Sequence, residues 1–390
     1  MSYTPKEQIA ILSRGVQEFF SPADLEKKLL KKKQLRVKLG LDPTIADIHL
    51  GHTVVLQKLR QFQDLGHEVI FLIGDFTAQI GDPSGRSKTR PMLTAKEVKE
   101  NSRTYLTQAF KILDKKKTKV HFNSEWLGKL RAMELIQLGA KQTVARMLER
   151  LDFKERFKEG QDISVYEFYY PLLQAYDSVA LKADVELGGL DQKFNLLLAR
   201  QVQERYGQEP EVVILLPLLV GTDGVKKMSK SFNNYVGITE KPKEIFGKIM
   251  SLTDEGMHHY YELLTSEDMT RIRGMHPKEA KVHLGKLLVR RYYSEKEADQ
   301  AAKEFEEIFA KGGRPENIEE VQLTQLSEKL VDILPEAGLA TSKSEARRLV
   351  QQNAVRLDDV RVTDMEQRLE KGKSYLVQVG KRKFKRVTLK

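Results

Sequence analysis

Two imidazoles three positions apart stand at the start of a predicted helix. His49, Gly51 and His52 are followed by apolar residues at the spacing of one buried helix face as far as Leu65, and Gly66 ends the helix. A helix start that faces the end of a strand presents free N–H groups and the positive end of a dipole, which suits phosphate. Gly51 lets a phosphate or a flat ring approach the backbone. The pattern indicates a nucleotide site, although a motif of four residues also occurs by chance.

A second segment with chemical character is a loop far downstream, in which Lys227 follows His49 by 178 positions. It runs from Gly221 and ends in Lys227-Met-Ser-Lys-Ser231. Glycines at its turn and three lysines predict a mobile, cationic lid for an anion, with a solvated loop as the alternative.

Three polar side chains share one face of an otherwise apolar helix. Tyr170, Gln174 and Asp177 stand at i, i+4 and i+7, after a capping box that begins at Ser164. Pro171 should remove one backbone hydrogen bond and bend this helix. We expect the three side chains to line a pocket for a small polar ligand, with a surface stripe as the alternative.

Buried strands are predicted to position these groups. A strand at Leu35–Leu39, the helix that starts at His49 and the apolar run Glu68–Gly74 form a right-handed strand–helix–strand unit. Further strands are predicted at Val120–Asn123, Ala183–Leu187 and Val212–Leu216. Helices are expected over about 3–30 with a new start at Ser21-Pro22, and over about 94–113, 125–160 and 242–311. Ligands of parallel sheets sit at the carboxyl ends of the strands, so the turns there should share one rim.

Three turns on this rim carry polar residues, and they are Gly40–Thr44, Gly81–Arg86 and Gly188–Gln192. The second turn resembles a P-loop but lacks the Gly-Lys-Ser/Thr that a P-loop requires, and no Gly-x-Gly-x-x-Gly occurs in the chain. Both fingerprints are therefore absent, and turn chemistry alone could explain the second turn.

The composition narrows the class of protein. A chain of 390 residues can form two or three domains with a large core. The lack of cysteine excludes disulfides, thiolate zinc sites and thiol catalysis. The first residues lack the apolar core of a signal peptide, and no apolar run approaches the roughly 18 residues of a membrane span. We expect a soluble, cytoplasmic protein.

The net charge of +11 is concentrated at one end of the chain. The last fifty residues hold 14 Lys and Arg against 6 Asp and Glu. A basic module beside a nearly neutral body suggests a polyanion partner, with a solubilising tail as the alternative.

The predicted organisation is α/β. A Rossmann-like parallel-sheet catalytic domain at 1–235 contains a largely helical insertion at about 124–182. A helical domain at 236–318 and a small C-terminal α+β domain at 323–390 follow, with a linker at Lys311–Pro315.

The pair His49-Leu-Gly-His52 and Lys227-Met-Ser-Lys-Ser231, in this order, resembles the two signatures of class I aminoacyl-tRNA synthetases. Four more segments look like the set of the bacterial tyrosyl-tRNA synthetase family, namely Gly40–Thr44, Gly81–Gly85, Tyr170–Asp177 and Gly188–Gln192. The resemblance covers essentially the whole chain, and the C-terminal module resembles an S4-type RNA-binding domain.

The resemblance implies a reaction in two steps. The carboxylate of tyrosine attacks the α-phosphate of ATP, pyrophosphate leaves, and tyrosine then passes to the 3′ end of tRNA(Tyr). No side-chain nucleophile is required, so positioning and charge stabilisation should supply the catalysis. ATP is a substrate, Mg²⁺ accompanies it mainly on phosphate oxygens, and no tightly bound cofactor or metal site of the protein is expected.

The resemblance also assigns residues. Those expected to act on the phosphates during the reaction are Thr44, His49, His52, Arg86, Arg90, Lys227 and Lys230. Those expected to hold ATP are Asp42, His49, Gly51, His52, Asp191, Lys227, Met228, Ser229, Lys230 and Ser231. Those expected to bind tyrosine are Lys38, Gly40, Asp82, Tyr170, Gln174, Asp177 and Gln192.

Within the tyrosine set, Asp177 matches the acceptor for the phenolic hydroxyl. A buried carboxylate left without its hydroxyl partner is costly, which rejects phenylalanine, and tyrosyl enzymes are the standard example of this effect. The chain also departs from the family. Lys38 stands where many members have a tyrosine that touches the phenol, Leu190 where Ser or Thr is common, and Val55 where a polar residue near the ribose is frequent.

The expected partners are tRNA(Tyr), L-tyrosine, ATP and a second copy of the chain, with no membrane. The C-terminal residues expected to contact RNA are Lys343, Arg347, Arg348, Arg356, Lys381 and Lys383. The rival interpretations are a tryptophanyl-type synthetase, a small-molecule nucleotidyltransferase and a non-catalytic RNA-binding protein on the same fold. Asp177 argues against the first, because an indole gains nothing from a buried carboxylate. The lysine lid argues against the second, and the intact His and Lys signatures against the third.

Overall fold

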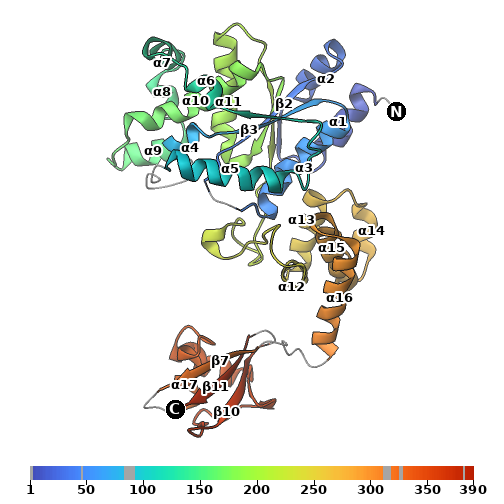
Figure 1. The fold of residues 1–390 in the computed structure, drawn as a ribbon, viewed down its shortest axis with the longest axis vertical. Coiled ribbons are helices and arrows are strands. Elements are labelled where there is room, and N and C mark those ends of the chain that lie inside the picture. Colours follow the sequence, from blue (N-terminus) through green and yellow to red (C-terminus); the bar gives the residue numbers. More distant parts are fainter. Residues whose placement is uncertain (1–2, 45–46, 83–92, 311–317, 325–327, 381–382) are drawn as a thin grey trace. The chain divides into compact units, whose positions relative to one another are not determined.

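The computed structural model describes residues 3–44, 47–82, 93–310, 318–324, 328–380 and 383–390. It divides into two compact units, Met1–Ala301 and Ala302–Lys390 (Figure 1). Among the described residues, no helix has the length and apolar character needed to cross a membrane.

The larger unit is built on a six-stranded sheet with the order β1-β6-β5-β2-β3-β4. Its strands are β1 (Glu18–Phe20), β2 (Arg36–Leu41), β3 (Glu68–Ile73), β4 (Thr118–Phe122), β5 (Val185–Gly189) and β6 (Val212–Leu216). All neighbours are parallel except β1, which pairs antiparallel with β6 at the sheet edge. The predicted α/β class with a parallel sheet is confirmed.

The strands are central because their side chains are apolar on both faces. Val212–Leu216 and residues 69–73 of β3 are buried throughout, as a parallel sheet covered on both sides requires. The chain runs from β2 outward to β3 and β4, and later from β5 outward to β6. The order therefore reverses between β2 and β5, which creates the crevice where such sheets bind ligands.

Helices cover both faces of the sheet. α3 (Leu50–Asp64) packs on β2, β3 and β5. α10 (Val165–Leu181) and α11 (Lys193–Arg205) pack together and reach the sheet through Leu181 against Ile70 and through Leu196 against Val213. Other helices of this part are α1 (Pro5–Ser13), α2 (Pro22–Lys31), α4 (Thr77–Ile80), α5 (Ala95–Ala109) and the single-turn η1 (Leu190–Gln192).

Three expectations about helices were wrong in detail. Residues 18–20 form strand β1 rather than helix, because Glu18 to Phe20 pair with residues 213–215 of β6. The stretch 125–160 is not continuous, and it contains α6 (Ser124–Leu127), α7 (Ala132–Gly139), α8 (Val144–Met147) and α9 (Leu151–Lys158). The helix expected to reach residue 113 ends at Ala109.

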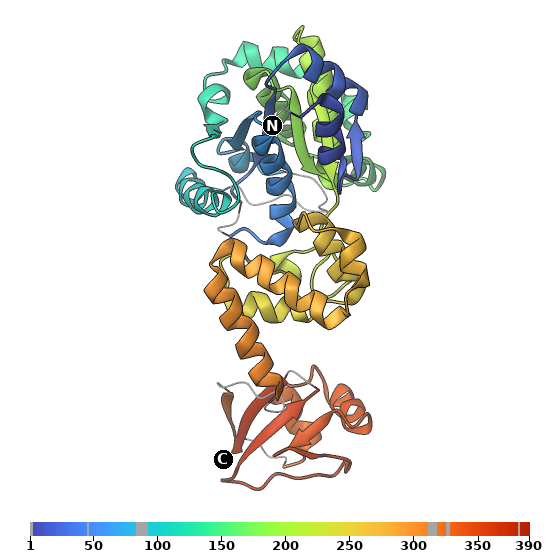
Figure 2. The ribbon, with the colours of Figure 1, turned by 90° about the vertical axis from the view of Figure 1, so that its right-hand side faces the viewer.

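A helical group completes the larger unit. It consists of α12 (Pro242–Met250), α13 (Asp254–Leu264), α14 (Met269–Gly274), α15 (Pro277–Tyr292) and the start of α16 (Glu295–Ala310), after the single-turn η2 (Lys230–Phe232). α13 packs on α3, and Figure 2 shows this group, in yellow to orange, beside that helix in blue.

The smaller unit has its own sheet and core. Its strands are β7 (Glu319–Leu323), β8 (Val355–Leu357), β9 (Val360–Arg361), β10 (Ser374–Val379) and β11 (Lys383–Leu389), in the order β7-β11-β10-β8-β9. Helices α17 (Leu330–Glu336) and α18 (Lys343–Gln351) pack on each other. Leu334, Val350 and Val377 belong to one buried cluster. β7 was not predicted, because its partner β11 lies more than sixty residues away.

Candidate active site

The predicted site residues converge on the carboxyl ends of β2 and β5, on either side of the point where the strand order reverses. Asp42 directly follows β2, Asp191 follows β5 in η1, and His49 precedes α3. This is the place where the sheet topology predicts a ligand.

The start of α3 holds the two imidazoles together. The ring centroids of His49 and His52 are 3.9 Å apart, and the backbone N–H of His49 donates to Nδ1 of His52 at 3.3 Å. Burial lowers the pKa of His49 to about 2 and that of His52 to about 4, and the charge of Lys230 acts in the same direction. Both rings are therefore neutral at physiological pH. Nδ1 of His49 is buried without a hydrogen-bond partner.

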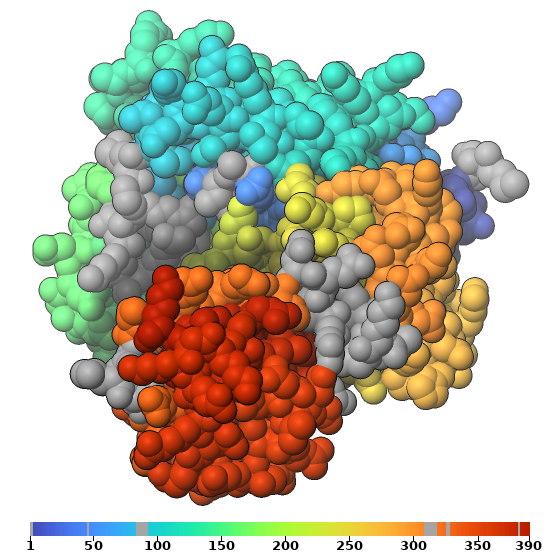
Figure 3. Space-filling view, turned by 60° about the horizontal axis from the view of Figure 1, so that its bottom comes forward, coloured from blue at the N-terminus to red at the C-terminus, as the bar shows by residue number. Residues whose placement is uncertain are grey.

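The segment that follows the lid loop is hydrogen-bonded to the same helix start. The backbone N–H of Leu50 donates to the carbonyl of Val236 at 2.9 Å, and that of Ile238 donates to the carbonyl of Ile48 at 3.2 Å. A Cβ at Gly51 would lie 3.0 Å from the His49 ring and 3.7 Å from Met228. Glycine therefore lets the His49 ring and Met228 pack close to the backbone at this position. Figure 3 shows the loop region, in yellow, at the surface between α5 in cyan and the helical group in orange.

Both motif lysines of the loop face carboxylates across the site. Nζ of Lys230 lies 2.6 Å from Oδ2 of Asp47, and Nζ of Lys227 lies 3.8 Å from Oδ2 of Asp191. Lys227 is 53% exposed and Lys230 is 28% exposed, so these weakly held ion pairs leave the lysines able to move to a more highly charged partner.

Asp42 is fixed by two hydroxyl groups. Tyr170 donates its hydroxyl to Oδ2 at 2.9 Å, and Thr77 donates to Oδ1 at 2.7 Å. Burial raises the pKa of Asp42 to about 7, although the two hydrogen bonds oppose this shift. A side chain at Gly74 would collide with this carboxylate, since its Cβ would come within 2.0 Å of Oδ1.

Asp177 is the deepest carboxylate of the set. It is 3% exposed and accepts from Nε1 of Trp126 at 2.8 Å and from Nδ2 of Asn123 at 3.2 Å. Asn123 also donates to Thr77 at 3.0 Å. A continuous chain of hydrogen bonds therefore links Tyr170, through Asp42 and Thr77, to Asp177. Burial raises the pKa of Asp177 to about 7, against the lowering effect of the Lys38 charge.

A second chain of amides joins the remaining predicted residues. Nδ2 of Asn195 donates to the amide oxygens of Gln174 and Gln192, each at 3.0 Å. Gln192 in turn donates to Oδ2 of Asp82 at 2.9 Å. The structure thus turns the polar face of α10 inward rather than toward water, since Tyr170 meets Asp42 after β2 and Gln174 meets Asn195 of α11. Asp177, on the same face, meets Asn123 after β4.

Lys38 lies in a buried cluster of charges on the α10 side of the sheet. It is 0% exposed, pairs with Oε1 of Glu186 at 2.9 Å and donates to Oγ of Ser178 at 2.6 Å. Ser178 donates to Glu211 at 3.0 Å, whose Oε2 has no hydrogen-bond partner. Burial alone would lower the pKa of Lys38, but the two glutamates outweigh it and raise that pKa. Burial and Glu186 hold the pKa of Glu211 well above its usual value.

Other predicted residues lie on the same rim. Gly40 is the fifth residue of β2, and the backbone N–H of Thr44 donates to the carbonyl of Asp42 at 2.8 Å. Ser229 and Ser231 share a hydroxyl hydrogen bond of 2.8 Å in the lid loop. Three predicted residues lie outside the described part of the chain, namely Arg86, Arg90 and Lys381.

Sequence reasoning missed four residues of the two hydrogen-bond chains around Tyr170, Gln174 and Asp177, which are Thr77, Asn123, Trp126 and Asn195. It also missed Ser178, Glu186 and Glu211 beside Lys38, and Asp47 beside Lys230. Trp126 carries the one tryptophan ring of the chain, and Asn123 ends a predicted strand on the ligand rim. A lone tryptophan near that rim was the available signal, because an indole N–H that is even partly buried needs an acceptor.

The predicted RNA-contacting cations of the smaller unit are exposed where they are described. They are Lys343, Arg347, Arg348, Arg356 and Lys383. Lys343 pairs with Asp332 at 2.9 Å. Arg347 and Arg348 are consecutive residues of α18, a helix whose buried residues are Ala346 and Val350.

The arrangement offers positioning and charge rather than a nucleophile. Acceptors fixed by hydrogen bonds stand at one end of the site, and the neutral imidazoles of His49 and His52 stand with the loop lysines at the other. Among the described residues, no group of three or more His, Cys, Asp or Glu side chains could hold a metal ion. Such a site suits a reaction between two bound substrates, one of which carries phosphates.

Comparison with protein families gives two matches that together span most of the chain. Residues 30–310 match the family described as "tRNA synthetases class I (W and Y)". Residues 310–387 match the "Tyrosine--tRNA ligase SYY-like C-terminal domain".

Curated relatives match over nearly the full length. The chain is 52% identical to the tyrosine–tRNA ligase of Francisella tularensis over 99% of both chains. It is 54% identical to that of Aquifex aeolicus, over 98% of this chain and 99% of the relative.

Solved structures show the same fold at lower identity. The mitochondrial tyrosyl-tRNA synthetase of Aspergillus nidulans, truncated at its C-terminus, aligns with a TM-score of 0.65 at 20% identity, over 78% of this chain and 94% of that one. The tyrosyl-tRNA synthetase of Archaeoglobus fulgidus, complexed with L-tyrosine, aligns with a TM-score of 0.62 at 24% identity, over 76% and 99%.

Proposed function

The chain belongs to the class I tRNA synthetases, among their tyrosine–tRNA ligases, and from that premise we propose how its residues carry out the reaction. An oxygen of the tyrosine carboxylate attacks the α-phosphorus of ATP, and the bond to the β-phosphate breaks, releasing pyrophosphate. A terminal ribose hydroxyl of tRNA(Tyr) then attacks the carbonyl of the tyrosyl-adenylate, and AMP leaves with the tyrosyl ester formed.

The amino-acid end selects tyrosine. In this proposal Asp177 accepts the phenolic hydroxyl, and the donors Trp126 and Asn123 hold its carboxylate in place at 2.8 and 3.2 Å. Tyr170, Gln174 and Asp82, with Gln192 close by, surround the substrate ammonium. The hydrogen bonds that already fix these side chains support the assignment, because preorganised groups lose little entropy on binding.

The nucleotide end stabilises charge. His49, Gly51 and His52 hold ATP at the start of α3, with Asp42 on the amino-acid portion of the adenylate and Asp191 on its ribose. Thr44, Lys227 and Lys230 meet the phosphates as pyrophosphate departs, with Arg86 assisting. The exposed ion pairs of the lysines support this role, since exchange of one carboxylate for a polyphosphate increases their Coulombic attraction. Mg²⁺ enters with ATP on the phosphate oxygens.

The smaller unit binds tRNA in this proposal, through exposed cations on and around α18. The division into a sheet domain at 1–235, a helical domain at 236–318 and an RNA-binding domain at 323–390 follows the same assignment. The cytoplasm, where translation takes place, is the proposed location.

A homodimer is proposed from exposed apolar side chains within the larger unit. Large side chains that are more than half exposed stand on α7 to α10, and they are Met133, Ile136, Val144, Leu151, Phe157 and Val165. Leu151 and Val165 are each 74% exposed. A group of this kind is typical of a covered interface.

The observation that carries the choice of tyrosine is the buried Asp177 carboxylate with two fixed donors. The test is tRNA charging by the purified protein with labelled tyrosine, tryptophan and phenylalanine in separate reactions. We expect tyrosine alone to be transferred. Charging with tryptophan would contradict the phenol assignment, and no charging with active tRNA would contradict the function.

A further inference from the structure

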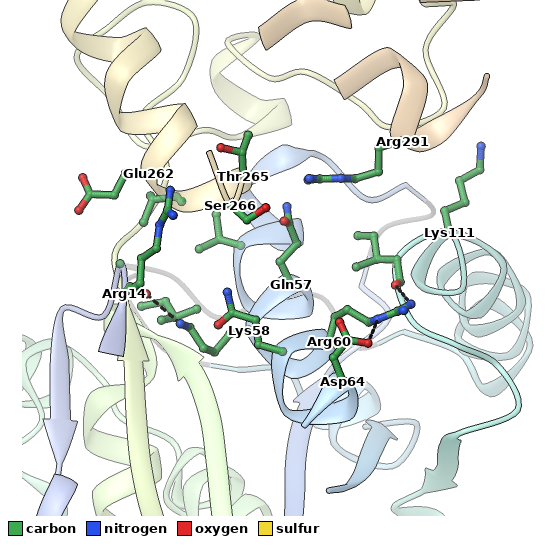
Figure 4. A pocket seen from close by; sticks show the side chains of 16 residues that line it. Arg14, Gln57, Lys58, Arg60, Asp64, Lys111, Glu262, Thr265, Ser266 and Arg291 are labelled. Carbon is green, nitrogen blue, oxygen red and sulfur yellow. Dashed lines mark hydrogen bonds and ion pairs between the residues drawn. The ribbon is translucent and has the colours of Figure 1, made fainter. Parts of the chain in front are cut away.

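A cavity of about 320 Å³ lies outside the site described above, between α3, α13 and the loop after α1 (Figure 4). Its wall includes the middle of α3 rather than the helix start that carries His49. The cavity belongs entirely to the larger unit, since its lining runs from Arg14 to Arg291.

The lining is strongly cationic. Five basic side chains, Arg14, Lys58, Arg60, Lys111 and Arg291, face two acidic ones, Asp64 and Glu262. Arg60 pairs with Asp64 at 2.7 Å, so the opposite charge of Asp64 is already used.

Three of the remaining cations are held by neutral carbonyls. Arg14 donates to the carbonyl of Glu267 at 2.7 Å, Lys111 to that of Tyr292 at 2.9 Å and Arg291 to that of Leu264 at 2.5 Å. Neutral acceptors fix these groups without cancelling their charge, so the cavity retains a positive potential that favours an anion.

Lys58 is a buried cation that lies beside another cation, Arg14. Lys58 is 4% exposed, and its ammonium donates to the carbonyls of Leu12 and Arg14, each at 2.8 Å. Burial and the charge of Arg14 lower the pKa of Lys58 to about 8. A buried ammonium beside a guanidinium is destabilising unless an anion offsets it.

Two glutamines one turn apart on α3 supply unused polar atoms. Nε2 of Gln57 and Oε1 of Gln61 are both buried without a hydrogen-bond partner, and both residues line the cavity. Figure 4 shows Gln57 in the middle of the cavity, between Ser266 and Arg291. A donor and an acceptor left unpaired in this way match the hydroxyl groups of a ligand, and buried groups seldom remain unpaired.

We propose that this cavity binds a small sugar phosphate, with the phosphate near Lys111 and Arg291 and the sugar hydroxyls on Gln57, Gln61 and Ser266. None of the described lining residues is aromatic, so nothing here stacks on a base, which favours a sugar phosphate over a nucleotide. The cavity is also larger than a phosphate ion alone requires.

The test is isothermal titration of the full-length protein with ribose 5-phosphate, ribose and inorganic phosphate. The protein is first saturated with tyrosine and a non-hydrolysable ATP analogue, so that binding at the catalytic site is separated from binding here. We expect ribose 5-phosphate to bind once per chain with a Kd of roughly 1 mM or below. Ribose should not bind, and phosphate should bind more weakly.

Two variants identify the site. Lys111→Gln should weaken ribose 5-phosphate binding about 10-fold or more, because it removes a charged hydrogen bond. The matched control is Lys116→Gln. Lys116 is an exposed lysine five positions away that does not line the cavity, so this variant should bind ribose 5-phosphate with unchanged affinity.

Gln57→Leu should also weaken binding, while the melting temperature of the ligand-free variant stays equal or rises, because an unpaired buried amide is lost. Binding that disappears when the ATP analogue is present would overturn the proposal. Equal affinity of all variants for ribose 5-phosphate would also overturn it, as would no binding of ribose 5-phosphate. A short RNA titrated in the same way should not bind at this cavity, and binding of that RNA without binding of ribose 5-phosphate would contradict the proposal.

Discussion

The amino-acid end and the nucleotide end of the proposed site hold their charged groups in different ways. Asp177 is 3% exposed, accepts hydrogen bonds from two fixed donors, and belongs to a chain of hydrogen bonds that reaches Tyr170. Lys227 and Lys230 stand on a surface loop and pair with single carboxylates. One end is built from fixed buried acceptors, and the other from loop cations, of which Lys227 is exposed and Lys230 half-buried.

The difference follows from what each end must do. Discrimination between tyrosine and phenylalanine depends on the cost of an unpaired buried group, which is large only where water cannot enter. Stabilisation of a departing pyrophosphate needs charges that approach as the charge develops. Loss of the buried group should therefore change which amino acid reacts, and loss of an exposed lysine should change how fast it reacts.

Asp177→Ala should have the largest effect. The phenol, Trp126 and Asn123 all lose their partner, so kcat/KM for tyrosine should fall by roughly 1,000-fold. Phenylalanine should lose far less, and the ratio between the two substrates should collapse. Pyrophosphate exchange measured with each amino acid gives both values. An unchanged ratio would remove Asp177 from its proposed role.

Lys230→Gln should slow the chemical step without altering tyrosine binding. We expect kcat for adenylate formation to fall about 100-fold, because one charge on the departing phosphates is lost. The KM for tyrosine should stay constant. Lys226→Gln is the matched control, since Lys226 is an exposed lysine of the same loop outside the motif positions. Equal loss in both variants would indicate a general loop effect.

Lys38→Met should move the pH dependence of tyrosine binding. The pKa of Asp177 is about 7, raised by burial and lowered by the Lys38 charge. As the pH rises from 6 to 8 the carboxylate ionises and becomes an acceptor for the phenol, so the KM for tyrosine should fall. Without Lys38 the pKa of Asp177 rises, and the midpoint of this profile should move to higher pH.

Folding of the Lys38 variant needs its own control, because Glu186 would be left buried and unpaired at a cost of about 3–5 kcal/mol. The double variant Lys38→Met with Glu186→Gln removes both charges, and its midpoint should lie between those of the parent and the single variant. Lys119→Met, an exposed lysine of β4, should leave the profile in place. A midpoint unmoved in all three proteins would show that Lys38 does not act on Asp177.

The smallest effect is expected at the nucleotide end. Because the pKa of His49 is about 2 and that of His52 about 4, both rings stay neutral from pH 6 to 8. With magnesium in excess, the KM for ATP should change less than about twofold over this range. A change as large as that for tyrosine would mean that the histidines titrate, and the contrast between the two ends would fail.

Local patterns predicted much of the fold. The unit from β2 to β3 was predictable because its apolar residues follow the period of each element, and β6 was predicted at Val212–Leu216 with the observed bounds. β1 was not predictable, since its three residues are a strand only through pairing with residues almost two hundred positions away.

The same distinction holds for the candidate site. Tyr170, Gln174 and Asp177 were found from their spacing on one helix, and the structure turns all three inward. Trp126 reaches Asp177 from 51 positions away and Asn123 from 54 positions away, and no local period encodes those contacts. Tertiary packing alone brings these donors to the carboxylate.

The measurement that tests the central claim most directly is pyrophosphate exchange with ATP and Mg²⁺, without tRNA, in the presence of tyrosine, tryptophan or phenylalanine. The buried acceptor at Asp177 predicts exchange with tyrosine alone. Exchange with tryptophan would contradict the assignment of the amino-acid end, and no exchange with any of the three would contradict the catalytic role of the whole site.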